Sequence, residues 1–114
     1  MEKKTIEDKQ FQFNKLRCKY PDRIPIIIEE NLNCKLKLKN YKYLVPKDIN
    51  MSQFLYIIRT NMNIGEKQAI FTFVKNGKDY ILVNMNELIE NIYNNFKYED
   101  NFLYIKFGIE NTFG

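Results

Sequence analysis

The sequence predicts a single α+β domain, and three observations lead to this prediction. The chain has 114 residues, which is the size of one ordinary domain. Apolar residues make up 45% and charged residues 28%, a globular composition with enough apolar side chains for one core. Stretches with apolar residues every three or four positions are interleaved with β-branched or alternating stretches, so helices and strands both occur along the whole chain.

The expected elements follow the order helix, strand, strand, helix, strand, strand, helix, strand. The first helix covers residues 5–19 and places Ile6, Phe13 and Leu16 on one stripe. It stops before Pro21, because proline disfavours the helical conformation in the preceding residue. The expected strands cover Arg23–Glu30, Tyr43–Pro46, Ala69–Val74, Tyr80–Val83 and Phe102–Ile109, and the other two helices follow Asn50 and Asn84.

Short local signals mark several boundaries. Asn50 and Gln53 are three residues apart, the spacing at which the side chains of a cap residue and of the third residue of the helix satisfy each other's backbone N–H groups. Asn84 and Glu87 repeat this spacing, so a similar cap is expected before the third helix. Asn76-Gly77 predicts a tight hairpin turn between two strands.

Removing the first helix leaves the order ββ-α-ββ-α-β, which is that of the β-grasp fold of ubiquitin. The predicted fold class is therefore α+β, a ubiquitin-like β-grasp with an N-terminal helical extension. Residues 1–20 are expected to form that extension, packed on the core. Residues 21–114 are expected to form the ubiquitin-like domain, with a flexible C-terminal tail over residues 110–114.

The composition excludes several function classes. The chain has no histidine, which excludes Ser-His-Asp and Cys-His catalytic sites and His-ligated metals. Its 4 glycines are scattered, so no phosphate-binding loop is expected, and 2 cysteines are too few for a disulfide framework or a zinc site. We expect no enzyme activity, no cofactor and no metal. No apolar stretch resembles a signal peptide or a membrane span, so a protein of the cytosol or nucleus is expected.

Positive charge is concentrated in the first part of the chain. Residues 1–47 hold 12 Lys or Arg against 6 Asp or Glu, and the densest stretch is Lys35–Lys39. This pattern is typical either of a solvated face or of a basic surface that binds acidic peptide, anionic lipid or nucleic acid. Nucleic-acid binding would need interleaved aromatic residues, and only Tyr41 and Tyr43 lie near, so no nucleic-acid partner is expected.

Several sequence blocks resemble one family over nearly the whole chain. The blocks include Tyr20–Pro25 (Tyr-Pro-Asp-Arg-Ile-Pro), Tyr43–Pro46 (Tyr-Leu-Val-Pro), Gln53-Phe54, Phe102–Ile105 and Phe113-Gly114. Together they resemble the autophagy-related ubiquitin-like modifiers, the family of GABA-receptor-associated protein and microtubule-associated light chain three. The chain departs from the family by about two added residues near Phe96–Tyr98, and by missing prolines after Val74. Both departures are expected to reshape the surface opposite the peptide groove.

The resemblance implies a modifier rather than an enzyme. Gly114 would be adenylated, passed as a thioester through activating and conjugating enzymes, and joined to phosphatidylethanolamine. The chain ends at this glycine, so either it is a processed form or it needs no trimming. A cysteine protease would reverse the conjugation. The modifier would be monomeric and cytoplasmic before lipidation and would lie on the autophagosome membrane afterwards.

The resemblance also places a groove for receptor and adaptor peptides of the form aromatic-x-x-aliphatic. Pro25 removes one backbone donor, and the following strand is short, so a free strand edge is expected to accept the peptide as an added strand. If Ile24, Ile26 and Ile28 face the core, Pro25 and Ile27 face outward.

The resemblance divides the groove residues into three sets. The first pocket, for the aromatic residue, would be lined by Leu16, Pro25, Ile27, Lys42, Leu44 and Phe102. The second pocket, for the aliphatic residue, would be lined by Tyr43, Val45, Pro46, Ile49, Phe54 and Ile57. Val45, Phe54 and Ile57 are equally well explained as ordinary core residues. Acidic residues flanking the motif would meet Arg23, Lys42 and Lys47.

Three alternatives remain at this point. The chain could be a modifier of the autophagy protein twelve type, which is joined to a protein, although that type tends to end in Trp-Gly and this chain has no Trp. It could be a membrane-associated homologue with a role on another organelle. It could also be an independent lipid- or nucleic-acid-binding domain that uses the Lys35–Lys47 stretch.

Overall fold

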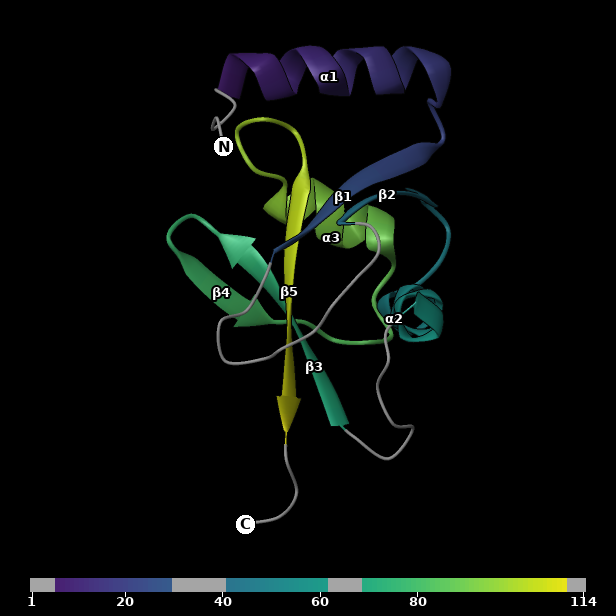
Figure 1. Cartoon of the computed structure of the whole chain (residues 1–114), viewed down its shortest axis with the longest axis vertical. Helices are drawn as coiled ribbons and strands as arrows, with labels where there is room; N and C mark the ends of the chain where they lie inside the picture. The colour runs from purple at the N-terminus through teal and green to yellow at the C-terminus, as the bar shows by residue number, and fades with distance from the viewer. Residues whose placement is uncertain (1–5, 30–40, 62–68, 111–114) are drawn as a thin grey trace.

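The computed structural model describes residues 6–29, 41–61 and 69–110, which form three helices and five strands in the predicted order (Figure 1). They are α1 (Ile6–Lys19), β1 (Arg23–Glu29), β2 (Lys42–Pro46), α2 (Met51–Asn61), β3 (Ala69–Asn76), β4 (Asp79–Leu82), α3 (Ile89–Phe96) and β5 (Leu103–Glu110). Glu110, predicted to begin the tail, is the last residue of β5. The basic stretch Lys35–Lys39 and residues 111–114 lie outside the described residues.

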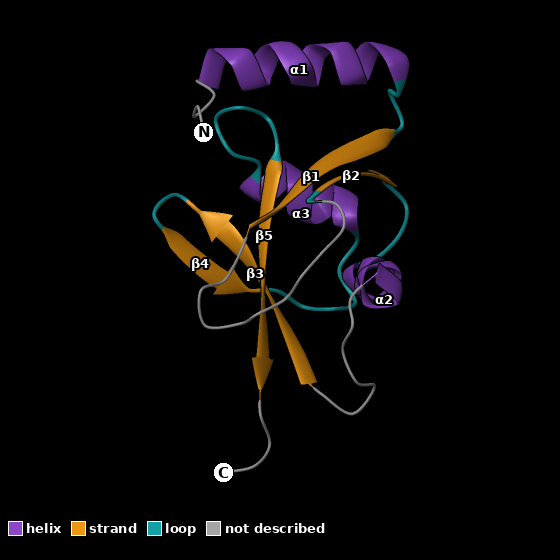
Figure 2. Ribbon diagram, viewed as in Figure 1, coloured by secondary structure: helices purple, strands orange, loops and turns teal. Residues whose placement is uncertain are grey.

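The five strands form one mixed sheet in the order β2-β1-β5-β3-β4. The central pair β1 and β5 is parallel, and the other neighbours are antiparallel. Figure 2 shows α2 and α3 close to the sheet, whereas α1 lies across one end of it. This arrangement confirms the predicted α+β class and its ubiquitin-like β-grasp.

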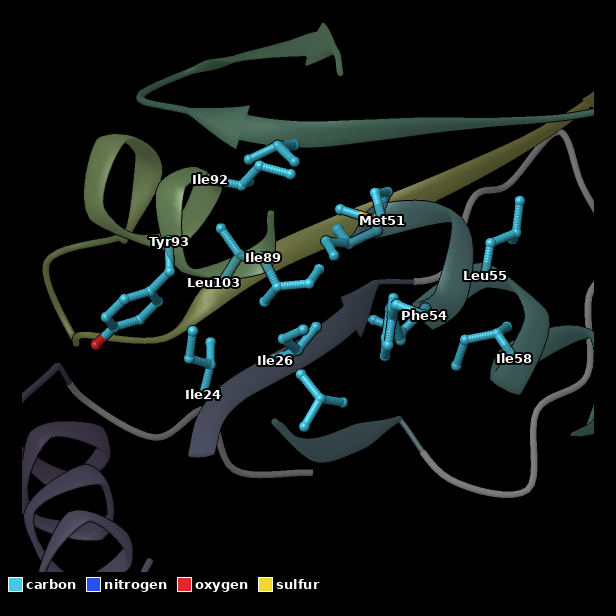
Figure 3. Close-up of a cluster of buried hydrophobic side chains, with 14 of the residues drawn as sticks. Ile24, Ile26, Met51, Phe54, Leu55, Ile58, Ile89, Ile92, Tyr93 and Leu103 are labelled. Carbon is cyan, nitrogen blue, oxygen red and sulfur yellow. The ribbon is translucent and has the colours of Figure 1, made fainter. Parts of the chain in front are cut away.

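The core lies between the sheet and helices α2 and α3. Ile24, Ile26 and Ile28 of β1 are only 1–4% exposed, which confirms that every second residue of this strand faces the core. Figure 3 shows Phe54 and Ile58 of α2 on the same cluster. α3 contributes Ile89, Ile92 and Tyr93, and β5 contributes Leu103.

Pro25 lies in β1 without breaking a hydrogen bond to β2, because its backbone nitrogen faces away from that strand. The N–H of Ile28 donates to the Tyr41 carbonyl at 2.7 Å, and that of Lys47 to the Asp22 carbonyl at 3.4 Å. In an antiparallel pair every second residue of a strand directs its N–H and C=O toward the partner strand. Since Ile28 bonds to β2, the other even-numbered residues of β1 also direct their peptide groups toward β2. The missing N–H of Pro25 therefore faces the β5 side, where pairing begins only at Ile26.

The opposite face of the sheet is more covered than the alternation in the sequence indicates. Leu103, Ile105 and Phe107 face the core, but Phe102 and Tyr104, which alternate with them, are also buried, at 3% and 5% exposure. Leu16 of α1 and the side chain of Phe102 border one cavity on this opposite face. The side chains of Ile6 and Phe13, predicted on the same stripe, lie outside the described part of the chain.

The predicted cap of α2 is confirmed, and that of α3 is wrong. The Asn50 side chain accepts a hydrogen bond from the Gln53 N–H, and Gln53 accepts one from the Asn50 N–H, both at 2.9 Å. Asn84 instead accepts from the Asn86 N–H at 2.9 Å, which closes a turn before the helix. The N-cap of α3 is Leu88, whose side chain cannot make a capping hydrogen bond.

The predicted β3–β4 hairpin is confirmed, but its turn is shifted by one residue. Asn76 pairs with Asp79, so the central turn residues are Gly77 and Lys78 rather than Asn76 and Gly77. Gly77 has a φ of +66°, whereas Lys78 has no positive φ. A positive φ at the first central position alone is typical of a type II′ turn, which uses glycine there.

Candidate functional site

The β2 strand leaves one backbone edge without a strand partner among the described residues. It is the terminal strand of the sheet and pairs only with β1. Because Tyr41 and Lys47 exchange hydrogen bonds with the β1 side, the peptide groups of Lys42 and Leu44 point the other way, off the sheet. An extended peptide can pair with groups arranged in this way.

Arg23 already interacts with this edge. A guanidinium nitrogen of Arg23 donates to the Leu44 carbonyl oxygen at 3.3 Å. The contact lies at the solvent-exposed surface, where such a bond contributes only about 1 kcal/mol. A peptide that pairs with Leu44 would therefore displace or share this donor.

A cavity of about 500 Å³ opens between α1 and the face of the sheet that carries Pro25 and Leu44. Its volume lies in the range of ordinary ligand pockets. It brings together five of the six residues predicted for the first pocket: Leu16, Pro25, Lys42, Leu44 and Phe102. Ile27 does not line it, and Gln12, Lys15, Ile26 and Tyr43 complete the lining.

The cavity has an apolar interior and a cationic rim. The ammonium of Lys42 donates to the Gln12 side-chain oxygen at 3.4 Å, and that of Lys15 lies 5.4 Å from the centre of the Phe11 ring. None of the described lining residues is an Asp or a Glu. The site is therefore suited to an apolar group with a negative charge close to it.

The sequence interpretation missed Gln12 and Lys15. The available signal was their helical spacing, because Gln12, Lys15 and Leu16 are three and four residues apart and so share one side of α1. Only the position of α1 against β2 reveals which side of the helix borders the groove.

The residues predicted for the second pocket are divided between several surroundings, and one of them, Tyr43, also lines the large cavity. The Tyr43 and Phe54 rings pack edge to face with their centres 5.9 Å apart. Val45 and Phe54 are buried in the core, whereas Ile57, one helical turn from Phe54, is 39% exposed. Ile49 packs against the core, and Pro46 borders a small polar cavity with Asp22, Arg23, Lys47 and Asp48. Val45 and Phe54 are thus core residues, which leaves Ile57 as the more accessible of the two predicted residues on α2.

The three residues predicted to meet acidic flanks have different surroundings. Lys42 lies at the rim of the large cavity. Lys47 forms an ion pair with Glu90 at 3.8 Å, and both it and Arg23 share the polar cavity with Asp22 and Asp48. Positive charge is therefore concentrated at Lys42 and Lys15, on the α1 side of the groove.

The loop with the added residues also differs from expectation. It was expected to reshape the surface opposite the groove, yet Phe102 at its end lines the large cavity. The side-chain amide of Gln10 in α1 donates to the Glu99 carbonyl of this loop at 2.7 Å. The loop therefore lies beside the groove.

The described residues offer little for other chemistry. No group of three or more Cys, Asp or Glu side chains among them could hold a metal ion. No helix in this part of the chain is long and apolar enough to cross a membrane. Gly114, the predicted conjugation residue, lies outside the described residues.

A β-grasp sheet whose edge strand pairs on one side only within the described residues, with an apolar cavity beside it, is typical of a ubiquitin-like protein. The family model for Atg8, described as an autophagy ubiquitin-like protein, matches residues 8–114. The chain belongs to the Atg8 family and is a ubiquitin-like modifier of autophagy, not an enzyme. The family resemblance is thereby confirmed.

Individual relatives agree with this assignment. Autophagy-related protein 8e of Arabidopsis thaliana is 40% identical over 110 residues, which cover 96% of this chain and 87% of that protein. Autophagy-related protein 8 of Schizosaccharomyces pombe is also 40% identical, over 96% of this chain and 88% of that protein. The crystal structure of Trypanosoma brucei ATG8 superposes with a TM-score of 0.83 at 33% identity, covering 97% and 93% of the two chains.

Proposed function

We propose that this Atg8-family chain is joined through Gly114 to phosphatidylethanolamine and then recruits receptors to autophagosomal membranes. The Gly114 carboxylate would react with ATP to form an adenylate and release pyrophosphate. An enzyme thiol would then displace AMP to give a thioester, and the lipid amine would displace the thiol to form the amide. The family match, which extends to residue 114, supports this role. Two acyl chains would then anchor the protein firmly.

The placement of the two apolar sites on opposite sides of β2 carries the receptor-binding proposal. The large cavity lies on the α1 side of β2, whereas Ile57 lies on α2. Tyr43 borders both, since it lines the cavity and packs on Phe54. Side chains of an extended peptide alternate between faces, so residues three positions apart point to opposite faces. An aromatic-x-x-aliphatic peptide has this spacing. Its backbone would pair with Lys42 and Leu44 while its two anchors enter opposite sites.

Charge at the groove favours acidic peptides. Arg23, Lys42 and Lys47 remain the proposed flank-recognition residues, and the structure adds Lys15 at the rim of the aromatic site. Such exposed charges raise association rate and selectivity more than affinity.

Reconstituted conjugation tests the proposal. The chain would be incubated with family activating and conjugating enzymes, ATP and vesicles that contain phosphatidylethanolamine, and its mass and vesicle sedimentation would be measured. We expect the wild type and Leu44→Ala to gain the lipid, since both keep Gly114, and a chain lacking Gly114 to remain unmodified and folded. Lipidation of the truncated chain would refute the role of Gly114. Conjugation to a protein amine alone would support the autophagy protein twelve type instead.

A further inference from the structure

The segment Lys97–Phe102, here called the α3–β5 loop, is closed by its own backbone. The N–H of Tyr98 donates to the Phe102 carbonyl, and that of Asn101 to the Tyr98 carbonyl, both at 2.9 Å. Asn101 has a φ of +69°, a conformation that asparagine tolerates better than most residues. Phe102, whose side chain lines the aromatic cavity, is therefore the last residue of a closed turn rather than a free strand end.

Asp100 is the buried centre of this loop. Asp100 is only 1% exposed, and both of its carboxylate oxygens accept hydrogen bonds. One accepts from the N–H of Phe102 at 3.0 Å, and the other from the hydroxyl of Tyr104 at 2.5 Å. Because a buried carboxylate without partners is costly, these bonds restrict the loop to one geometry.

Tyr104 is held in place by its neighbours on the outer face of the sheet. Its ring packs edge to face on Tyr98 with centres 5.5 Å apart. The ammonium of Lys75 lies 4.5 Å from the centre of the Tyr98 ring and 5.2 Å from that of Tyr104. Burial, together with the hydrogen bond to Asp100, raises the pKa of Tyr104, so its hydroxyl remains a donor at neutral pH.

The loop is also attached to two helices. The Gln10 side chain of α1 donates to the Glu99 carbonyl at 2.7 Å, and the Tyr93 hydroxyl of α3 donates to the Asn101 carbonyl at 2.7 Å. Figure 3 shows the Tyr93 hydroxyl directed away from the other core side chains. α1 supplies one wall of the aromatic cavity through Leu16, and the loop supplies Phe102. One closed loop therefore connects both sides of this cavity.

We propose that Asp100 is a positioning residue that sets which aromatic anchor the cavity accepts. By fixing the α3–β5 loop, it holds Phe102 and the α1 wall at one separation. The cavity then matches one ring size and discriminates against others. This inference rests on the proposed peptide-binding function.

Matched peptides test the inference. One pair differs only in Trp or Phe at the aromatic anchor, and a second pair only in Leu or Val at the aliphatic anchor. Dissociation constants would be measured by calorimetry for the wild type, Asp100→Asn and Tyr104→Phe. Tyr80→Phe is the matched control, because the Tyr80 hydroxyl donates to Glu29 at 2.5 Å rather than to Asp100.

We expect Asp100→Asn and Tyr104→Phe to shift the Trp-to-Phe affinity ratio toward unity by about fivefold, the factor that loss of one typical hydrogen bond gives. The Leu-to-Val ratio should not change, and the control should alter neither ratio. Tyr104→Phe removes a single oxygen and carries the test alone if Asp100→Asn does not fold.

The outcomes separate the inference from the proposed function. A wild-type chain that binds none of the peptides would refute the proposed function. A wild type that binds, with variants whose Trp-to-Phe ratio is unchanged, would overturn the inference alone. Equal weakening of all four peptides would indicate a merely structural role of Asp100 and would also overturn it.

Discussion

Leu44 is the residue through which the groove is best tested. Its side chain is half-buried at the cavity, and its backbone lies on the free edge of β2. We expect Leu44→Ala to weaken binding of an aromatic-x-x-aliphatic peptide by about 1–3 kcal/mol, since a central apolar anchor contact is lost. Peptide titration measures this loss, and circular dichroism checks the fold. Tyr43→Ala is less informative, because Tyr43 packs on Phe54. Unchanged affinity in a folded Leu44→Ala chain would remove the cavity from the site.

Thr72 presents an unusual polar group in the core. The residue is fully buried, and its hydroxyl has no hydrogen-bond partner among the described residues. Thr72→Val keeps the shape and removes the buried polar group, so we expect the free energy of unfolding to rise by about 1 kcal/mol. Urea unfolding measures the change. Thr60→Val, which removes an exposed hydroxyl that donates to the Ile57 carbonyl at 2.7 Å, should give no such gain. A destabilised Thr72→Val chain would show that the hydroxyl has a partner.

At the scale of single elements, two helices with the same sequence signal begin differently. α2 starts with the reciprocal Asn50–Gln53 cap, whereas Asn84 closes a turn ahead of α3. We expect Asn50→Ala to lower the free energy of unfolding by about 1 kcal/mol, as for loss of a helix cap. Thermal or urea unfolding would show a smaller loss for the matched Asn84→Ala variant. Equal losses would contradict this distinction.

The α3 cap was mispredicted because other contacts compete for that segment. The N–H groups of Met51 and Ser52 donate to the carbonyls of Glu87 and Met85 at 3.0 and 2.9 Å. The segment before α3 is therefore bound to the start of α2 and cannot adopt a helical turn from Asn84. Local spacing predicts such caps only where no distant backbone group competes.

At the scale of the whole molecule, the distribution of charge leads to a prediction about salt. Lys15 and Lys42 border the aromatic cavity, whereas Lys47 pairs with Glu90, and Arg23 interacts with the β2 edge. Replacing Lys15 and Lys42 by Gln should flatten the salt dependence for a peptide with acidic flanks. Exposed ion pairs contribute only about 0–1 kcal/mol each, so a neutral peptide should be little affected.

The charge-matched control is the replacement of Arg23 and Lys47 by Gln, which removes the same net charge from the other end of the groove. It should change the salt dependence less. Titrations at about 0.1 M and about 1 M salt measure the difference, because the screening length falls from about 10 Å to about 3 Å. A larger effect from Arg23 and Lys47 would show that the acidic flank lies at their end.

Alkaline stability depends on Tyr104. Burial raises the pKa of its hydroxyl in the folded chain, whereas in the unfolded chain this hydroxyl loses its proton at about pH 10. Above that pH the unfolded state binds fewer protons, so the free energy of unfolding falls as pH rises, by up to about 1.4 kcal/mol per pH unit from this group. Urea unfolding of Tyr104→Phe at about pH 9 and about pH 11 should show a smaller fall than the wild type. Equal falls would contradict the shift.

The order of elements and the faces of the central strands were predictable from the sequence. Periodicity reports which side of an element is apolar, and burial of Ile24, Ile26 and Ile28 follows directly from it. The family blocks also predicted five residues of the large cavity. Both kinds of information lie in short stretches of the sequence, so they can be read without the tertiary structure.

The tertiary arrangement alone placed α1 and the α3–β5 loop on the second face of the sheet. Phe102 and Tyr104 are buried there, although alternation indicates an exposed side. The position of α1 made Lys15 part of the groove, and the position of α3 brought Glu90 to Lys47. The physical reason is that packing between elements far apart in the chain depends on their positions in space. Periodicity within one element carries no information about which neighbour will cover it.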